Sequence, residues 1–240
     1  RFEDGSSALM QRTPSSTTDR KTFTISFWMK RGNIGTTSIL FCATIDHNGA
    51  PDDTEFFDII TDGDTLSVAG YTQRWLQTTQ VFRDPSAWYH IVVACDTTIS
   101  SPADNRVRMY VNGSEVTDFS TRNNPAEDFL FPVNSQVKHN ISSRSGWLSD
   151  GFYDGYLAEY HFIDGTALTP SSFGESGDYG EWKPKKVSGL TYGTNGFYLD
   201  FADSGNLGDD ESGNGNDLTE TNIAATDQML DTPTNNFCTL

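Results

Sequence analysis

The stretch 88–116, which begins with Trp88, constrains the fold of this chain more than any other. In residues 107–111 apolar side chains alternate with arginine and tyrosine, and strand side chains alternate between two faces in this way. The run ends in Asn112 and Gly113, two residues that tolerate the positive φ of a type I′ hairpin turn. The stretch therefore predicts an antiparallel β-unit with one buried face.

Further strands are expected on both sides of this unit. Residues 21–30 alternate in the same way, and short apolar runs separated by Gly, Asn, Asp and Ser recur along the chain. The expected strands are 21–30, 38–45, 56–60, 65–69, 155–163 and 196–201, with weaker patterns at 128–133 and 135–141. Many short strands joined by turn residues are typical of sandwiches. We predict an all-β fold, a two-sheet antiparallel β-sandwich.

The charge of the chain restricts its partners. It has 33 acidic and 16 basic residues among 240, a formal net charge of −17 at pH 7. Nucleic acid phosphates and anionic membrane surfaces would be repelled, so neither is an expected partner. No apolar run approaches the roughly 18 residues of a membrane-spanning helix, so no membrane insertion is expected. The carboxylates favour cations such as Ca²⁺, or serve solubility alone.

The three cysteines, Cys42, Cys95 and Cys238, do not have the spacing of a metal site, and an odd number cannot all pair. Cys42 and Cys95 lie in apolar runs, where a cysteine behaves as a small hydrophobic residue. We expect both to be buried thiols. The sequence begins at Arg1 with no visible signal peptide, so a processed or partial chain is expected.

Four segments occur together in an order that is typical of one family. They are, in chain order, TFTISFWMKRG, AWYHIVVACDTT, RMYVNGSEV and FYDGYLAEYHFIDGTALTP. Between about Phe23 and Pro170 they resemble the strand signatures of laminin-G-like, concanavalin A-like jelly rolls. The resemblance implies a lectin-like or glucanase-like β-sandwich. Because one fold hosts many functions, it does not by itself imply a chemistry.

The C-terminal part resembles another piece of the same family. Its segment NGFYLDFADSGNLGDDESGNGNDLT looks like one that often opens such domains. We expect a single laminin-G-like domain over residues 1–240 with its core in 20–175. Residues 190–240 either complete the sandwich in a permuted order or begin a truncated second copy. The whole run also resembles laminin-G-like domains in virion proteins of tailed bacteriophages.

The motifs of several enzyme classes are missing from the sequence. Glycosidases of this fold need two carboxylates beside the scissile bond, and the related laminarinases place them as Glu-x-Asp-x-x-Glu on one strand. No such string occurs, and Glu159 is expected to be a single hydrogen-bonded acid at the sandwich edge. There is no Gly-x-Ser-x-Gly elbow, and no metal-ligand spacing among His47, His90, His139 and His161. We expect no catalytic residues.

A loop rich in acidic and amide side chains follows the expected strand 196–201. Ca²⁺ takes roughly six to eight oxygen ligands from Asp, Asn and backbone carbonyls. The candidate metal ligands are Asp203, Asp209, Asp210, Asn214, Asn216 and Asp217. Calcium in comparable loops is also what the family resemblance implies. The regular calcium-loop spacing with a terminal Glu is absent, and the alternative is a series of Asx turns.

Aromatic residues in loop-like positions are the candidates for a sugar contact. An aromatic ring stacks on the apolar face of a pyranose, and sugar recognition in this fold typically uses loop aromatics. The candidates are Trp147, Tyr153, Trp182 and Trp75. By contrast, Trp28 and Trp88 lie at strand positions and are expected in the core.

We predict a non-enzymatic binding or adhesion module. The resemblance places it on a virion surface or outside the cell, in contact with a glycan, a cell-surface receptor or neighbouring virion proteins. The alternative is a purely structural decoration domain that contacts only neighbouring subunits, including copies of itself. A glycan-cleaving enzyme is the third alternative.

Overall fold

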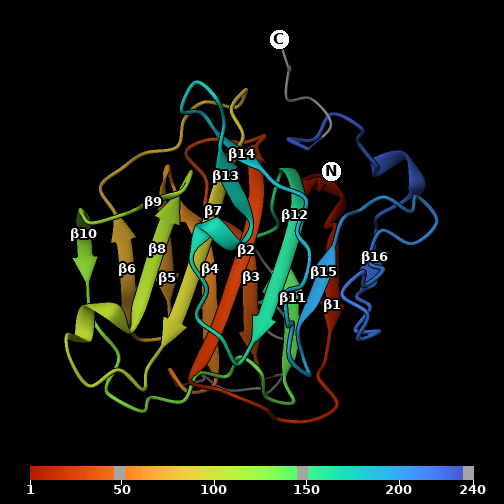
Figure 1. The fold of residues 1–240 in the computed structure, drawn as a ribbon. Helices are drawn as coiled ribbons and strands as arrows, with labels where there is room; N and C mark the ends of the chain where they lie inside the picture. The colour runs from red at the N-terminus through yellow and green to blue at the C-terminus, as the bar shows by residue number, and fades with distance from the viewer. Residues whose placement is uncertain (46–51, 145–150, 235–240) are drawn as a thin grey trace.

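Two antiparallel sheets lie face to face in the computed structural model, which describes residues 1–45, 52–144 and 151–234 (Figure 1). The sheet behind in Figure 1 has eight strands, in the order β10-β6-β5-β4-β3-β11-β1-β16. Its strands are β10 (Phe119–Arg122), β6 (Arg74–Thr78), β5 (Thr65–Ala69), β4 (Phe56–Asp62), β3 (Ser38–Thr44), β11 (Lys138–Ile141), β1 (Leu9–Arg12) and β16 (Thr219–Thr221). The predicted all-β sandwich is confirmed.

The sheet in front has six strands, in the order β15-β12-β2-β7-β8-β9. They are β15 (Phe197–Leu199), β12 (Gly155–Asp164), β2 (Thr22–Arg31), β7 (Tyr89–Asp96), β8 (Val107–Val111) and β9 (Ser114–Glu115). A separate pair, β13 (Gly174–Ser176) and β14 (Trp182–Pro184), lies in front of this sheet (Figure 1). Short 3-10 turns occur at Asp4–Ser6, Ala103–Asn105, Pro170–Ser172 and Ala225–Asp227.

The hairpin predicted at Asn112 and Gly113 is present between β8 and β9. Asn112 has a φ of 47° and Gly113 a φ of 81°, as a type I′ turn requires. The Asn112 side-chain oxygen also accepts a hydrogen bond from the His90 backbone N–H at 2.8 Å. The turn is thereby tied to β7, the neighbour of β8 in the sheet.

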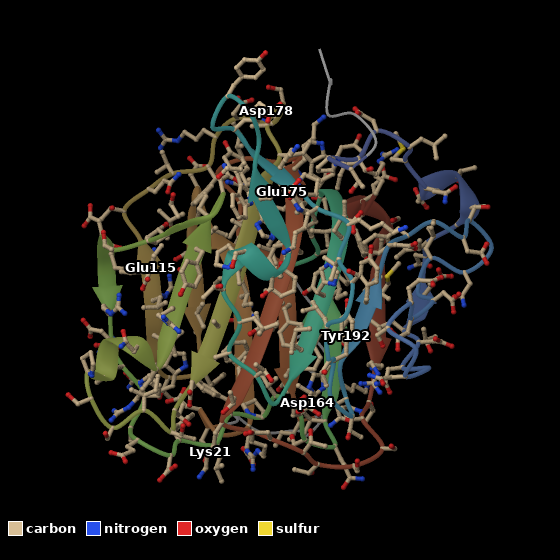
Figure 2. The ribbon with its side chains drawn as sticks, viewed as in Figure 1. Lys21, Glu115, Asp164, Glu175, Asp178 and Tyr192 are labelled. Atoms are coloured by element: carbon tan, nitrogen blue, oxygen red, sulfur yellow. The ribbon has the colours of Figure 1, made fainter. Side chains whose placement is uncertain are left out.

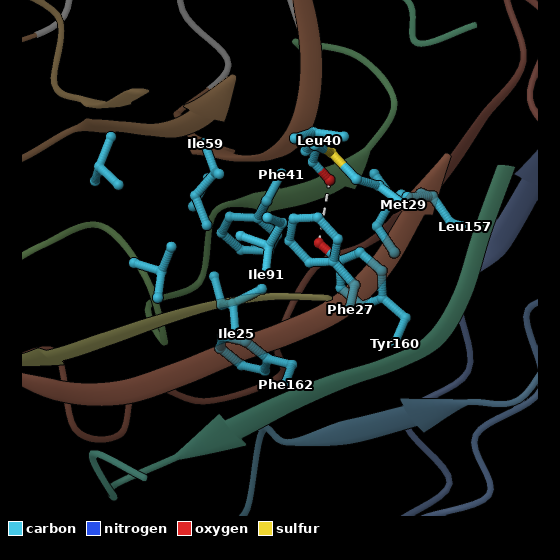
Figure 3. Packing of buried hydrophobic residues seen from close by; sticks show 14 of the residues in the cluster. Ile25, Phe27, Met29, Leu40, Phe41, Ile59, Ile91, Leu157, Tyr160 and Phe162 are labelled. Carbon is cyan, nitrogen blue, oxygen red and sulfur yellow. Dashed lines mark hydrogen bonds between the residues drawn. The ribbon is translucent and has the colours of Figure 1, made fainter. Parts of the chain in front are cut away.

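Large rings fill the space between the sheets. Tyr160 of β12 stacks on Phe27 of β2 with ring centroids 5.1 Å apart. Its hydroxyl donates to the Leu40 carbonyl of the opposite sheet at 3.1 Å, which satisfies a polar group inside the core (Figure 3). Cys95 and Cys42 are both buried, as expected. Cys238 lies outside the described residues.

The outer face of the six-stranded sheet is covered as well. The expectation that the unit 88–116 has one buried face is therefore wrong. Tyr110 and Ile163 point away from the core, yet they are buried against Phe173. The covering chain includes β13 and β14, and Glu175 of β13 lies in front of the sheet (Figure 2). A third layer removes apolar groups on this face from water, which explains why they are tolerated there.

The C-terminal residues add an edge strand to each sheet. β15 pairs with β12, and β16 pairs with β1. The expected strand 135–141 contains β11, whereas 128–133 is not a strand. Its backbone N–H groups form isolated hydrogen bonds instead of a ladder, for example from the Phe131 N–H to the Arg20 carbonyl at 3.1 Å. Its aromatic rings pack into the core. Within the described ranges, no helix is long and apolar enough to cross a membrane.

Candidate functional site

The edge strand β15 covers only part of β12. It pairs with residues 160–162, while Gly155 at the start of β12 forms an isolated bridge with Phe2. Between them, residues 156–159 have no strand partner on this edge in the part of the chain that the structure describes. A cavity of about 540 Å³ opens at this gap. Its walls come from β12, the end of β15, the segment after β14 and the C-terminal residues 227–234.

Two of the aromatic rings that line this cavity contact each other. Tyr156 of β12 and Trp88, the residue before β7, meet edge to face with ring centroids 6.4 Å apart. Both side chains are partly exposed. The Lys30 ammonium lies 5.6 Å from the centroid of the Tyr156 ring, within cation–π range. Partly exposed rings in a cavity offer a ligand a large apolar contact area.

Carboxylates line the same cavity, among them those of Glu159 of β12, Asp200 after β15, and Glu211. The charge of Asp200 raises the pKa of the Glu211 carboxyl, because like charges lie close together. Glu159 accepts a hydrogen bond from the Tyr198 hydroxyl at 2.5 Å. Burial and the nearby Glu159 carboxylate raise the pKa of Tyr198, so this hydroxyl keeps its proton and donates. The expectation of a hydrogen-bonded acid is confirmed for Glu159.

The acidic loop 203–217 folds back onto β15. The Asp210 carboxylate accepts backbone N–H bonds from Tyr198 at 2.9 Å and from Asn216 at 2.8 Å. Asp203 accepts a bond from the Gly205 N–H at 2.8 Å, which closes an Asx turn. Asp210 likewise accepts the Ser212 N–H at 2.9 Å, so the Asx-turn alternative is confirmed at Asp203 and Asp210.

The remaining predicted metal ligands also have protein partners. Asn214 and Asn216 donate their amide groups to carbonyls of residues 193–196. Asp217 accepts the Asp210 N–H at 3.1 Å, and Asp209 accepts the Asn206 side-chain N–H at 3.5 Å. The Arg12 guanidinium donates to the Asn216 side-chain oxygen at 2.5 Å, so a protein cation already lies at the loop. No group of three or more His, Cys, Asp or Glu in the described ranges suits a metal ion. The candidate ligands already take part in hydrogen bonds of the loop, and the calcium site stays a prediction from the sequence.

The aromatic residues predicted as sugar contacts do not come together. Tyr153 is 1% exposed and Trp75 is 5% exposed, so neither presents a ring face to solvent and both predictions are wrong. The Tyr153 hydroxyl donates to the Lys30 carbonyl at 2.8 Å, and Trp75 of β6 packs against Phe131. Residues with loop-like neighbours in sequence thus point into the core. Trp147 lies outside the described residues.

Trp182 of β14 packs on the outer face of the six-stranded sheet. Its ring stacks on His90 with centroids 5.9 Å apart, and its indole N–H donates to His90 Nδ1 at 2.9 Å. The other ring nitrogen of His90 lies 2.9 Å from the Ser26 hydroxyl. Burial lowers the pKa of His90 to about 3, so the neutral ring accepts the indole proton. Trp182 fixes β14 to the sheet and does not line the cavity.

The sequence pattern predicts only some of the cavity residues. Glu159 had a signal, because an acid inside an apolar strand needs a polar partner or a polar environment. The core position expected for Trp88 is wrong, because its ring is partly exposed. No pattern in the sequence marks Tyr156 as a cavity residue. Both rings lie at the ends of strands, Trp88 just before β7 and Tyr156 near the start of β12, and a pattern read along one segment does not show what covers them there.

Comparison with solved structures finds relatives of low identity. A putative carbohydrate binding protein from Bacteroides ovatus ATCC 8483 is 15% identical, with a TM-score of 0.54. The match covers 92% of this chain and 56% of that one, so the chain spans just over half of its length. At this identity the likeness shows the fold alone.

Two further structures resemble the fold at TM-scores below 0.5, which carry no argument about function. One is the CBM40 of Ruminococcus gnavus IT-sialidase bound to α2,3 sialyllactose, at 11% identity and TM-score 0.46, covering 65% of this chain and 80% of that one. The other is domain 4 of AbnA, a GH43 extracellular arabinanase from Geobacillus stearothermophilus, in complex with arabinotriose. Its identity is 20% and its TM-score 0.44, and the match covers 66% of this chain and 67% of that one.

Sequence comparison identifies the family. A search of curated protein sequences finds no match. The family model Laminin_G_3, described as the concanavalin A-like lectin/glucanases superfamily, matches residues 4–172. That stretch is more than half of the 240 residues and reaches from the turn before β1 to the turn before β13. The chain therefore belongs to the concanavalin A-like lectin/glucanases superfamily.

Proposed function

We propose that this chain is a non-catalytic carbohydrate-binding module whose site is the cavity beside β12 and β15. The observation that carries the proposal is the meeting of two partly exposed rings, Trp88 and Tyr156, with the carboxylates of Glu159 and Asp200 in one cavity. The description of the family, which names lectins, supports a sugar ligand.

The chemistry of the cavity matches both sides of a sugar. The C–H face of a pyranose is apolar and packs on aromatic rings, here those of Trp88 and Tyr156. Its hydroxyl groups are donors, and the carboxylates of Glu159 and Asp200 are acceptors. The volume of about 540 Å³ lies within the range of small-ligand pockets, roughly 300–1,000 Å³. A short oligosaccharide is the ligand that this combination favours.

The charge around the cavity favours an uncharged glycan. Its acidic lining residues outnumber the basic ones. They are Glu159, Asp200, Glu211, Asp227 and Asp231, against Arg1, Lys185 and Lys186. Lys185 already donates to the Ser171 carbonyl. A sugar acid would meet a net negative potential, so we expect neutral glycans to bind more tightly than sialylated or uronic acid-containing ones.

The finer part of the proposal is the setting of the module. The resemblance of the whole run, including Trp182–Pro184, to laminin-G-like domains of tailed-phage virion proteins supports a place on a virion surface or outside the cell. The partner there is a host glycan or a neighbouring virion protein. Mass spectrometry of purified particles and immunogold labelling of their outer surface test this setting. Absence of the chain from purified particles contradicts the virion surface.

Removal of the Trp88 ring or of the Tyr156 ring is expected to weaken glycan binding. We expect Trp88→Ala and Tyr156→Ala each to raise the Kd of the best glycan-array hit about tenfold, because a stacked ring contributes on the order of 1–2 kcal/mol. Calorimetry with the purified glycan measures the effect. The matched control is Tyr179→Ala, since Tyr179 is 87% exposed and does not line the cavity. An array without a hit, or an equal Kd in all three variants, contradicts the proposal.

A further inference from the structure

Glu159 occupies an irregular position in β12. A β-bulge interrupts the pairing of β12 with β2 between Ala158 and His161, and Glu159 within the bulge has a φ of +48°. Residues other than glycine rarely adopt this left-handed conformation, and such outliers cluster at functional sites. A bulge re-aims a side chain that would otherwise follow the alternation of the strand. Here it brings the Glu159 carboxylate to the cavity.

Both oxygens of the Glu159 carboxylate accept hydroxyl donors. Oε2 accepts the Tyr198 hydroxyl and Oε1 accepts the Thr234 hydroxyl, each at 2.5 Å. Tyr198 is held firmly, because its ring stacks on His161 with centroids 4.2 Å apart. Thr234, by contrast, is exposed and belongs to the C-terminal segment, residues 228–234. The two donors therefore differ in how readily they move away.

The C-terminal segment reaches the cavity while burying little surface of its own. Gln228 anchors its start by donating to the carbonyls of Phe201 at 3.0 Å and Ala202 at 2.6 Å. Beyond this anchor, Met229 is 40% exposed and Leu230 is 74% exposed, although both line the cavity, and Pro233 beside Thr234 is the buried residue of the segment. A segment that buries one small residue opens more easily than the sheets around it.

We propose that Glu159 is the residue that recognises a ligand hydroxyl, and that Thr234 occupies it when no glycan is bound. The inference rests on the proposed glycan-binding function of the same cavity. The Thr234 side chain and a sugar hydroxyl are chemically alike, since each is an alcohol that donates one proton to Oε1. Glycan binding then exchanges one alcohol for another and displaces the C-terminal segment, which acts as an internal competitor.

Thr234→Val tests this competition, because it removes the hydroxyl and keeps the shape of the side chain. We expect the Kd of the best array hit to fall about three- to tenfold, the effect of about one hydrogen bond. Thr234→Ser keeps the hydroxyl and should retain the original Kd. Thr17→Val is the matched control, an exposed threonine that does not line the cavity. In the Thr234→Val background, where no hydroxyl of the protein competes, Glu159→Gln removes the charge of the acceptor and should raise the Kd several-fold.

Hydrogen exchange provides a readout that needs no glycan. Thr234→Val should speed amide exchange in residues 228–234 and leave β12 and β15 unchanged. Array hits that Thr234→Val binds no more tightly, together with unchanged exchange, overturn this inference and leave the proposed function standing. An array without hits contradicts the proposed function and this inference with it. Tighter binding with faster exchange supports both.

Discussion

The indole of Trp182 lies against two glycines. A Cβ atom on Gly113 would come 2.4 Å from the ring, and one on Gly174 would come 2.6 Å from it. Cβ atoms essentially never come this close to non-bonded heavy atoms. The indole can therefore approach only because both residues lack a side chain. The close approach permits the stack and the hydrogen bond to His90. Gly113 also needs its positive φ for the hairpin turn, whereas the role of Gly174 is space alone.

Gly174→Ala is therefore a clean test of this packing. The added methyl group should push the Trp182 ring away from His90 and lower the free energy of unfolding by about 1–3 kcal/mol, as overpacking does. Urea unfolding followed by tryptophan fluorescence measures it. Gly5→Ala is the control, because a Cβ on Gly5 meets no atom within 4 Å. Equal stability of the two variants would show that the ring is not confined there.

At the scale of elements, the strands that can be predicted from the sequence are those with their own pattern. β2, β7, β8 and β12 have five to ten residues each with apolar groups at period two or a continuous apolar run. β1, β13, β14 and β16 have three or four residues and few large apolar side chains. Partners far along the chain define them, so no local pattern marks them.

The candidate site can be predicted from the sequence only at Glu159. Its position in an apolar strand is a local fact, but the bulge that turns it depends on pairing with β2. The cavity depends on where β15 stops against β12, and that register joins segments more than 30 residues apart. The same reason explains Tyr153 and Trp75, because flanking loop residues do not determine which way a ring points.

The acidic loop 203–217 yields a prediction about calcium. Asp210 already accepts backbone N–H groups, and the Arg12 guanidinium lies beside Asp210 and Asp217. We therefore expect the same melting midpoint in Ca²⁺, in Mg²⁺ and in EDTA. A ligand that binds only the folded state must raise the midpoint. A rise in Ca²⁺ that Mg²⁺ does not reproduce would contradict this expectation and support the calcium site predicted from the sequence.

At the scale of the whole molecule, three buried histidines link folding to pH. His90 and His161 lie under the outer layer, and His139 lies in the core against Phe41. Burial lowers the pKa of His90 and His161 to about 3 and that of His139 to about 4. Polar partners accommodate the neutral rings, such as the Tyr192 hydroxyl 2.9 Å from His161 Nδ1.

Stability should consequently fall as the pH drops from 7 to 5. Histidines of the unfolded chain bind protons near pH 6.5, while the folded forms of His90, His139 and His161 stay neutral to about pH 4 or below. The unfolded state therefore holds more protons in this window, and each histidine contributes a slope of up to about 1.4 kcal/mol per pH unit. Urea unfolding at pH 7, 6 and 5 measures the total.

Carboxylates with a lowered pKa do not reduce the stability of the fold between pH 7 and 5. Hydrogen bonding to Arg83 lowers the pKa of Asp64, so its stabilisation is present above the usual pKa of about 3.9 and is lost only in stronger acid. A decline between pH 7 and 5 thus reports the histidines together with the Arg1 amino group, whose pKa burial lowers to about 6. NMR titration of the folded protein tests this assignment. If the imidazole signals of His90, His139 or His161 shift near pH 6.5, burial of these rings is contradicted. A free energy of unfolding that stays constant between pH 7 and 5 would also contradict burial of these histidines.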